Sequence, residues 1–239
     1  MDFGVYIHVP FCRVQCPYCT FYTVLKPQDA SSMQSFLRAV GQEWRLRVTP
    51  RLQRGDRLRT LYLGGGTPSD LPASSLEAQL AVWRDELHQH GLGTLADLDE
   101  VTVECNPESA TPDTLDHLRE RGVGRVSLGV QSLHREDLVR LGRLATPEEI
   151  ETALGEVASR FETWNADLIL GIPGSNEARM LEALEFLAAS GTPHLSLYCL
   201  ELPRARAELV GDPQTEESEA AKAALYERAS SWLAARGYE

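Results

Sequence analysis

Short apolar runs rich in Val, Ile, Leu and Tyr alternate along the chain with longer segments in which apolar residues recur every three or four positions. The first pattern is typical of buried strands, and the second of amphipathic helices. We expect six strands, at residues 5–9, 59–63, 100–104, 125–130, 165–170 and 194–200. We expect six helices, at residues 31–48, 74–90, 112–121, 147–161, 176–189 and 216–236. This alternation predicts an α/β fold, a partial (β/α)6 barrel of the TIM-like type.

Two of the expected helices carry clear start signals. Thr111 and Thr146 each precede a proline and then acidic residues. A threonine can cap the free backbone N–H groups of a helix, proline fits its first turn, and carboxylates are favoured near its positive end. These signals fix the beginnings of the helices at residues 112 and 147.

Polar and glycine-rich motifs follow the strands. They are a cysteine loop after the first strand, Gly64-Gly65-Gly66-Thr67-Pro68-Ser69 after the second, Glu104-Cys105-Asn106-Pro107-Glu108 after the third, Gly129-Val130-Gln131-Ser132 after the fourth, and Gly171-Ile172-Pro173-Gly174 after the fifth, which also contains Asp167. In a barrel of parallel strands these ends meet at one rim, where functional residues gather. Each motif also has a plain structural explanation, such as a tight turn or a loop cap. The evidence for a functional site is therefore that the motifs recur at one rim.

The glycine triplet invites a more specific interpretation. Without Cβ atoms, residues 64–66 are expected to expose backbone N–H and C=O groups to a ligand, and Thr67 adds a hydroxyl. No lysine follows as in a Walker motif, and no G-x-G-x-x-G spacing is present. The pattern therefore favours a cradle for the carboxylate or ammonium of an amino-acid-like ligand over a phosphate loop.

Composition narrows the class of protein. The chain has 239 residues, a hydrophobic content of 43%, a mean hydropathy of -0.25 and a formal net charge of -12. No apolar run approaches the ~20 residues of a membrane span, and the negative charge argues against a nucleic-acid partner. The start Met1-Asp2-Phe3-Gly4 lacks the features of a signal peptide, which favours a cytoplasmic protein.

Cys12, Cys16 and Cys19 form a Cys-x3-Cys-x2-Cys run directly after the first strand. Three thiolates at this spacing can hold an iron–sulfur cluster and leave one iron of a cubane without a protein ligand. A structural zinc site would need a fourth ligand, and none follows at a suitable distance. His8 precedes the run but lies in an apolar alternating segment, which favours a packed residue. Five cysteines is an odd number, which disfavours a disulfide framework.

Other strand-end residues supply what a cofactor on the open iron needs. Together they supply a carboxylate for an ammonium, an arginine for a carboxylate and polar partners for ribose hydroxyls; they are Glu104, Gln131, Arg143 and Asp167. S-adenosylmethionine (SAM) carries all three kinds of group. Singly, each of these residues could equally be a solvated acid, a loop cap or a surface arginine.

Taken in order, the motifs resemble those of the radical-SAM coproporphyrinogen oxidase-like family. The matching segments are Tyr6-Ile7-His8-Val9-Pro10-Phe11-Cys12, the cysteine run with Tyr18, Gly-Gly-Gly-Thr-Pro-Ser, Glu-Cys-Asn-Pro-Glu, Gly-Val-Gln-Ser, Leu141-Gly142-Arg143 and Asp-Leu-Ile-Leu-Gly-Ile-Pro. The resemblance covers essentially the whole chain and implies a radical-SAM barrel. It also implies a [4Fe-4S] cluster on Cys12, Cys16 and Cys19, with SAM chelating the fourth iron and yielding a 5′-deoxyadenosyl radical. The residues that would line the SAM site are Tyr6, Tyr18, Gly65, Gly66, Thr67, Glu104, Gln131, Arg143 and Asp167, with Tyr18 beside the adenine.

The family contains two groups with different functions. One is the oxygen-independent coproporphyrinogen III oxidase, an enzyme that decarboxylates two propionate side chains. The other is the HemW-type heme chaperone, which binds heme for delivery to hemoproteins. Here Thr20 and Phe21 follow the third cysteine and only eleven residues precede Cys12, and both features resemble the chaperone group more closely. The resemblance thus implies heme or a porphyrinogen as ligand, a hemoprotein client, an electron donor, and membrane association only through a client; whether the chain is an enzyme stays open.

We expect residues 1–205 to form the barrel core and residues 206–239 to form an acidic loop and helix that lead toward a C-terminal domain absent from the chain. The family's His-Asn-x-x-Tyr-Trp heme motif is not present, so the resemblance assigns no heme ligand. Ala145, Ser175-Asn176 and an arginine-rich loop at residues 203–208 also depart from the family pattern. The acidic stretch at residues 208–219 is expected to lie on the surface.

Overall fold

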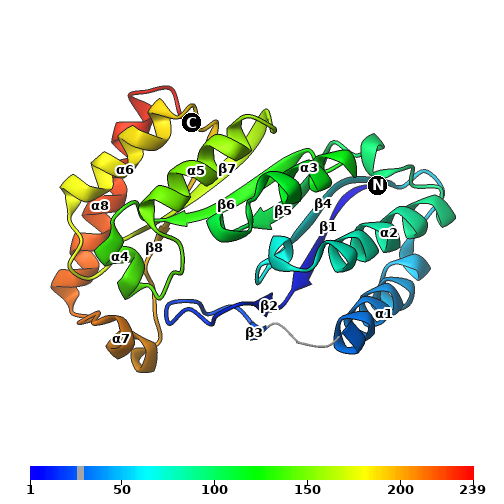
Figure 1. Cartoon of the computed structure of the whole chain (residues 1–239), viewed down its shortest axis with the longest axis horizontal. Coiled ribbons are helices and arrows are strands. Elements are labelled where there is room, and N and C mark those ends of the chain that lie inside the picture. The colour runs from blue at the N-terminus through cyan, green and yellow to red at the C-terminus, as the bar shows by residue number, and fades with distance from the viewer. Residues whose placement is uncertain (26–29) are drawn as a thin grey trace.

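Six parallel strands form one curled sheet in the computed structural model, which describes residues 1–25 and 30–239 (Figure 1). In spatial order the strands are β1 (Asp2–Val9), β4 (Arg57–Gly65), β5 (Glu100–Cys105), β6 (Arg125–Gln131), β7 (Thr163–Leu170) and β8 (His194–Cys199). Each strand of this sheet pairs with the strand of the same sheet that follows it along the chain, as βα units require. All six predicted strands and the partial barrel are therefore confirmed.

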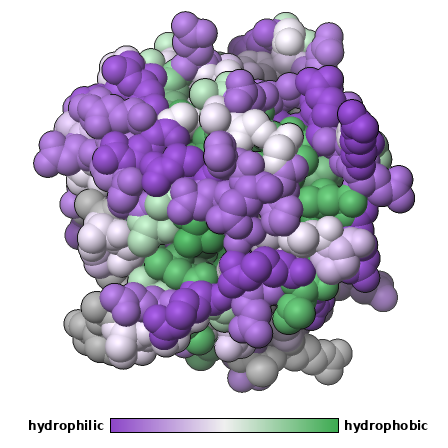
Figure 2. All heavy atoms as spheres, turned by 90° about the vertical axis from the view of Figure 1, so that its right-hand side faces the viewer, coloured by the Kyte–Doolittle hydropathy of each residue, from purple (hydrophilic) through white to green (hydrophobic). Residues whose placement is uncertain are grey.

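Helices cover the convex face of this sheet (Figure 1). They are α1 (Ala30–Arg47), α2 (Ala73–Gln89), α3 (Pro112–Glu120), α5 (Pro147–Ala158), α6 (Glu177–Ala189) and α8 (Glu216–Ala234), the counterparts of the six predicted helices. Thr111 and Thr146 accept hydrogen bonds from the backbone N–H groups of Thr114 and Glu149, so both predicted caps are confirmed. Figure 2 shows the end of the molecule that carries α1 and α2, where hydrophilic side chains predominate and hydrophobic ones lie in smaller patches between them.

The two faces of the sheet differ sharply in polarity. Side chains that point toward the helices are apolar and buried, as with Leu61, Leu63 and Val103. Alternate positions on the concave face carry Tyr62 and Glu104, with matching polar residues on the following strands. A closed TIM barrel fills its interior with branched apolar side chains. A polar concave face instead suits a binding site.

Several short elements escaped prediction. They are β2 (Phe11–Cys12), β3 (Val24–Leu25), α4 (Arg135–Arg140), α7 (Arg204–Val210) and the 3-10 turns η1 (Thr49–Arg51), η2 (Pro68–Asp70), η3 (Leu95–Asp97) and η4 (Pro107–Ser109). Each is too short for a hydrophobic period to reveal it. The expected loop at residues 203–208 was wrong, because α7 begins at Arg204 and continues to Val210, where it is followed by Gly211 in a left-handed conformation with φ 74°.

The acidic stretch at residues 208–219 is likewise not simply a surface loop. Asp212 is only 7% exposed, and one carboxylate oxygen lies 2.7 Å from Nζ of Lys222, a residue that is 6% exposed. Glu219 lies 2.8 Å from the same ammonium. This buried pair fastens the segment before α8 to the body of the protein, because the Lys222 side chain packs against Gly171 after β7. Within residues 1–25 and 30–239, none of the helices has both the length and the apolar character needed to cross a membrane.

Candidate cofactor site

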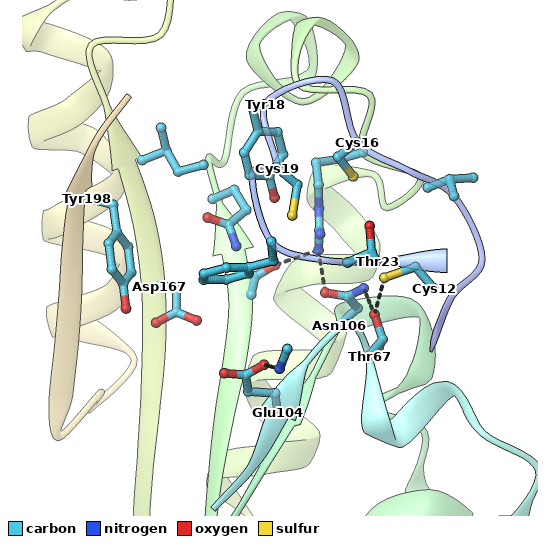
Figure 3. A pocket seen from close by; sticks show the side chains of 18 of the residues that line it. Cys12, Cys16, Tyr18, Cys19, Thr23, Thr67, Glu104, Asn106, Asp167 and Tyr198 are labelled. Carbon is cyan, nitrogen blue, oxygen red and sulfur yellow. Dashed lines mark hydrogen bonds between the residues drawn. The ribbon is translucent and has the colours of Figure 1, made fainter. Parts of the chain in front are cut away.

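A cavity of about 290 Å³ opens at the carboxyl ends of the strands (Figure 3). The three cysteines lie on one side of it, and Glu104, Asp167 and Tyr198 lie on the other. The predicted site residues that line the cavity are Cys12, Cys16, Tyr18, Cys19, Gly65, Gly66, Thr67, Glu104, Gln131, Arg143 and Asp167. Parallel pairing of five strands thus joins groups that are up to 155 positions apart, from Cys12 to Asp167.

Tyr6 is the predicted site residue that does not line the cavity. Its side chain is 57% exposed, and its hydroxyl lies 3.1 Å from Nδ1 of His8. Its ring packs against Tyr62, with 5.8 Å between the ring centroids. Tyr62 in turn donates a hydrogen bond to Glu104, so Tyr6 reaches the cavity only through a neighbouring side chain.

The cysteines of the loop are free thiols in a partly buried setting. Burial raises the pKa of the Cys12 thiol to about 11, and it also raises the pKa of Cys16. Cluster ligands must be thiolates, so metal binding here would displace protons that the thiols otherwise hold at neutral pH. Arg143 acts against burial at Cys16 by lowering its pKa. The donor set therefore suits a thiophilic group such as an iron–sulfur cluster.

A single metal ion needs ligands that converge on one point. In the part of the chain that the structure describes, no group of three or more His, Cys, Asp or Glu side chains is arranged around a single ion position. A cubane cluster binds each thiolate at a different iron, so its ligands need not converge on one point.

The cysteine loop is held in place from several directions. Arg13 forms an ion pair with the buried carboxylate of Asp70, at 2.5 Å. Arg206 on α7 donates to the backbone carbonyl of Cys19. Pro17 packs against Gly142, where an added Cβ would lie 2.7 Å from Cδ of the proline. Gly142 also has φ +66°, so both its conformation and its neighbour require glycine.

Arg143 is positioned to bind an anion. One terminal nitrogen donates to the side-chain oxygen of Asn106 at 2.9 Å and to the carbonyl of Gly129 at 2.8 Å. Its Nε is buried and has no partner among the described residues. Burial lowers the pKa of Arg143, but the neighbouring Tyr18, Glu108 and Cys16 outweigh this effect and the net shift is upward. The guanidinium therefore stays charged, and a ligand carboxylate could satisfy the unpaired N–H.

Glu108 is a pocket-lining acid that the sequence analysis did not select. One of its carboxylate oxygens is buried and lacks a partner among residues 1–25 and 30–239. An ammonium group of a ligand would satisfy this oxygen. Together with Arg143, Glu108 provides opposite charges for an amino acid moiety, so the residues present fit the methionyl part of SAM.

Glu104 and Asp167 stand across the cavity from the cysteines (Figure 3). Glu104 accepts hydrogen bonds from Tyr62 and from the backbone of Gly65, both at 2.8 Å. Asp167 accepts from Asn165 at 2.6 Å. Burial raises the pKa of both carboxyls, although these hydrogen bonds act in the opposite direction. Such acids favour a ligand that brings hydroxyl or cationic groups, as ribose does.

The N–H groups of two glycines of the triplet are bonded within the protein, so the expectation that they face a ligand was wrong for these two. The backbone N–H of Gly65 donates to Glu104, and that of Gly66 donates to the carbonyl of Val9 at 2.7 Å. The N–H of the following Thr67 donates to the carbonyl of Phe11 at 2.8 Å. At Gly66 an added Cβ would lie 2.5 Å from the carbonyl oxygen of Phe11. The glycines are needed because the end of β4 lies directly against β2 and the neighbouring side chains.

Gln131 adopts an unusual backbone conformation. Its φ is 68°, and it stands at an irregularity in the pairing of β6 with β7. A residue with a Cβ in this region is strained by about 1–2 kcal/mol. The strained residue lines the cavity, which supports a direct role for its side chain.

Other cavity residues were missed by the sequence analysis for identifiable reasons. Asn106 lies in the same motif as Glu104 and could have been selected with it, whereas Ser127 and Tyr198 lie in β6 and β8 at positions outside the motifs. Only the curvature of the sheet brings these last two to the cavity.

Comparison with known proteins identifies the family. The sequence matches the family model of the radical SAM superfamily over residues 6–187. The chain belongs to the radical SAM superfamily. Proteins of this superfamily use a [4Fe-4S] cluster and SAM, which confirms the predicted family and its cofactors.

Two similar proteins are named heme chaperones. The chain is 36% identical over 200 residues to the heme chaperone HemW of Mycobacterium tuberculosis, a match that covers 83% of this chain and 49% of the relative. It is 33% identical over 205 residues to HemW of Escherichia coli, covering 83% and 50%. The chain thus spans about half the length of the curated relatives that it matches.

The fold is shared with coproporphyrinogen III oxidase (HemN) from Escherichia coli, a radical SAM enzyme. The TM-score is 0.82 at 24% sequence identity, and the match covers 100% of this chain and 53% of that one. At this identity the similarity establishes the fold and leaves the activity to other evidence.

Replacing Gly142 by alanine is expected to displace the cysteine loop, because the new Cβ would meet Pro17 in a strained backbone conformation. Iron and sulfide content after anaerobic reconstitution should fall severalfold. Gly155 in α5 provides a matched control, since an added Cβ there meets nothing within 4 Å. Gly155→Ala should keep the wild-type iron content and gain about 0.5–1 kcal/mol of stability. Equal iron content in both variants would contradict the role of Gly142.

Replacing Gln131 by glycine is expected to stabilise the protein and at the same time to weaken its binding of SAM. Relief of the positive φ should raise the free energy of unfolding by about 1 kcal/mol, while loss of the side chain should weaken SAM binding to the reconstituted protein. Chemical denaturation and equilibrium dialysis measure the two effects.

Gln214 serves as the control for this substitution, because it also has a positive φ, 48°, but does not line the cavity. Gln214→Gly loses a hydrogen bond to the carbonyl of Leu202, which offsets the relief of strain, and it should leave SAM affinity unchanged. Unchanged SAM affinity in Gln131→Gly would remove Gln131 from the site.

Proposed function

We propose that Cys12, Cys16 and Cys19 hold a [4Fe-4S] cluster and that SAM binds at its fourth iron. The observation that carries this proposal is the cavity in which these three thiols meet a charged arginine with an unpaired buried N–H. When bound, the cluster and SAM would supply one-electron chemistry at the sulfonium.

The residues around the cluster have distinct roles in this proposal. Arg143 binds the carboxylate of SAM, and Glu108 binds its ammonium. Glu104, Gln131 and Asp167 bind the ribose hydroxyls, and the ring of Tyr18 lies beside the adenine. Gly65, Gly66 and Thr67 shape the wall of the cavity at the end of β4. Tyr6 supports Glu104 indirectly, through its contact with Tyr62.

We further propose that the whole protein is a heme chaperone, with heme as cargo and a hemoprotein as client. The support is the similarity of this chain to proteins named heme chaperone HemW, at up to 36% identity. An electron donor that reduces the cluster belongs to the same proposal. We infer a cytoplasmic setting, since all five cysteines are free and thiols persist in a reducing compartment.

The cluster proposal predicts the outcome of a cysteine replacement. A Cys12→Ala, Cys16→Ala, Cys19→Ala triple variant should lose the cluster absorption and the electron paramagnetic resonance signal of the reduced protein after anaerobic reconstitution. Cys105→Ala is the control, because Cys105 borders the same cavity but is 2% exposed and packs with the core, outside the cysteine loop. A full cluster in the triple variant would refute the assignment.

A chaperone and an oxidase can be distinguished by whether the reconstituted protein binds heme or decarboxylates coproporphyrinogen III. We expect saturable heme binding in an absorption titration. We expect no decarboxylated product when the protein is incubated with coproporphyrinogen III, SAM and a reductant. Formation of that product would favour the oxidase, and absence of heme binding would contradict the chaperone.

A further inference from the structure

A line of hydrogen bonds connects the proposed SAM side of the cavity with the cluster side (Figure 3). Arg143 donates to Oδ1 of Asn106 at 2.9 Å, and Nδ2 of Asn106 donates to Oγ1 of Thr67 at 2.9 Å. The Thr67 hydroxyl donates to Sγ of Cys12 at 3.9 Å.

Arg143 determines which group donates and which accepts in every hydrogen bond of this line. A guanidinium has donors and no acceptor, so the Asn106 amide must turn its oxygen toward Arg143. Its NH2 group then faces Thr67 and donates to the hydroxyl oxygen. The oxygen of Thr67 thus accepts one hydrogen bond, and its own proton is free to point at the sulfur of Cys12.

Arg143, Asn106 and Thr67 are each held in place by further hydrogen bonds. The carbonyl of Gly129 holds the same Arg143 nitrogen at 2.8 Å. The backbone of Asn106 is held by Ser109, whose hydroxyl exchanges hydrogen bonds with the Asn106 N–H and C=O at 3.2 and 3.0 Å. Thr67 is held by the bond from its N–H to Phe11. Asn106 therefore stands between two anchored neighbours, and its amide orientation sets that of the threonine hydroxyl.

We propose that Asn106 is a positioning residue that makes Thr67 a hydrogen-bond donor to Cys12 and so raises the reduction potential of the cluster. This inference rests on the proposed function, in which Cys12 is a cluster ligand. Reduction adds negative charge to a cluster and its thiolates, and a hydrogen bond to sulfur stabilises that charge. Asn106, whose amide bonds to Arg143 and Thr67, thus tunes the potential through its neighbour.

The test is a double-mutant cycle on Asn106→Asp and Thr67→Val, read as the cluster midpoint potential in a potentiometric titration without SAM. A carboxylate at position 106 can still accept from Arg143, but it cannot donate to Thr67 and instead attracts the threonine proton. Each single variant should lower the midpoint potential. Thr67→Val should cause a smaller shift in the Asn106→Asp background than in the wild type, because the hydroxyl there has already turned away from Cys12.

The cycle separates this effect from simpler ones. The added charge of aspartate acts in both backgrounds and cancels in the coupling. Thr67→Ser keeps the hydroxyl and should restore the wild-type potential. Thr102→Val replaces a fully buried threonine outside the cavity and should not move the potential. If Asn106→Asp does not fold, Asn106→Ala takes its place in the cycle, since Thr67 then loses the donor that orients it.

The outcomes are distinguishable. Additive shifts, or an unchanged potential in Thr67→Val, would overturn the role of Asn106 while leaving the cluster proposal intact. Failure of the wild-type protein to take up a cluster would overturn the proposed function, and this inference with it.

Discussion

All six strands of the sheet run in the same direction, so the residues that follow them collect at one rim. The cysteine loop after β1, the glycine turn after β4, Glu104 in β5, Gln131 in β6 and Asp167 in β7 share one cavity for this reason. An antiparallel arrangement would have sent alternate motifs to opposite edges of the sheet. The parallel direction of the strands is therefore the first requirement for the site, and the individual side chains are the second.

Burial gives this rim its chemistry. The concave face excludes enough water to raise the pKa of the thiols of Cys12 and Cys16 and of the carboxyls of Glu104 and Asp167. Arg143 keeps an unpaired buried donor, and its neighbours Tyr18, Glu108 and Cys16 shift its pKa upward. A ligand that brings a carboxylate, an ammonium and hydroxyls would relieve each of these buried groups, which is why SAM suits the cavity as a whole.

Tight backbone packing explains the glycines of the site better than ligand contact does. Gly66 lets the end of β4 lie against the carbonyl of Phe11, and Gly142 lets Pro17 approach the turn before Arg143. Both contacts hold the cysteine loop against the ends of distant strands. The motif residues thus fall into two groups. Some present a functional group to the cavity, and others are glycines that allow the cysteine loop to pack closely against the strand ends.

Local periodicity and motifs at strand ends were enough to predict the six strands, the six long helices, the cysteine triplet and eleven of the residues that line the cavity. That reasoning missed α7, Glu108, Asn106 and Tyr198, and it misjudged the N–H groups of Gly65 and Gly66 and the burial of Asp212. Each of these depends on what lies opposite a residue in space. Hydrogen-bond partners such as Arg143 and Asn106 are 37 positions apart, and no local pattern encodes such a pairing. Strand order and curvature decided them, since only the folded sheet brings those side chains within bonding distance.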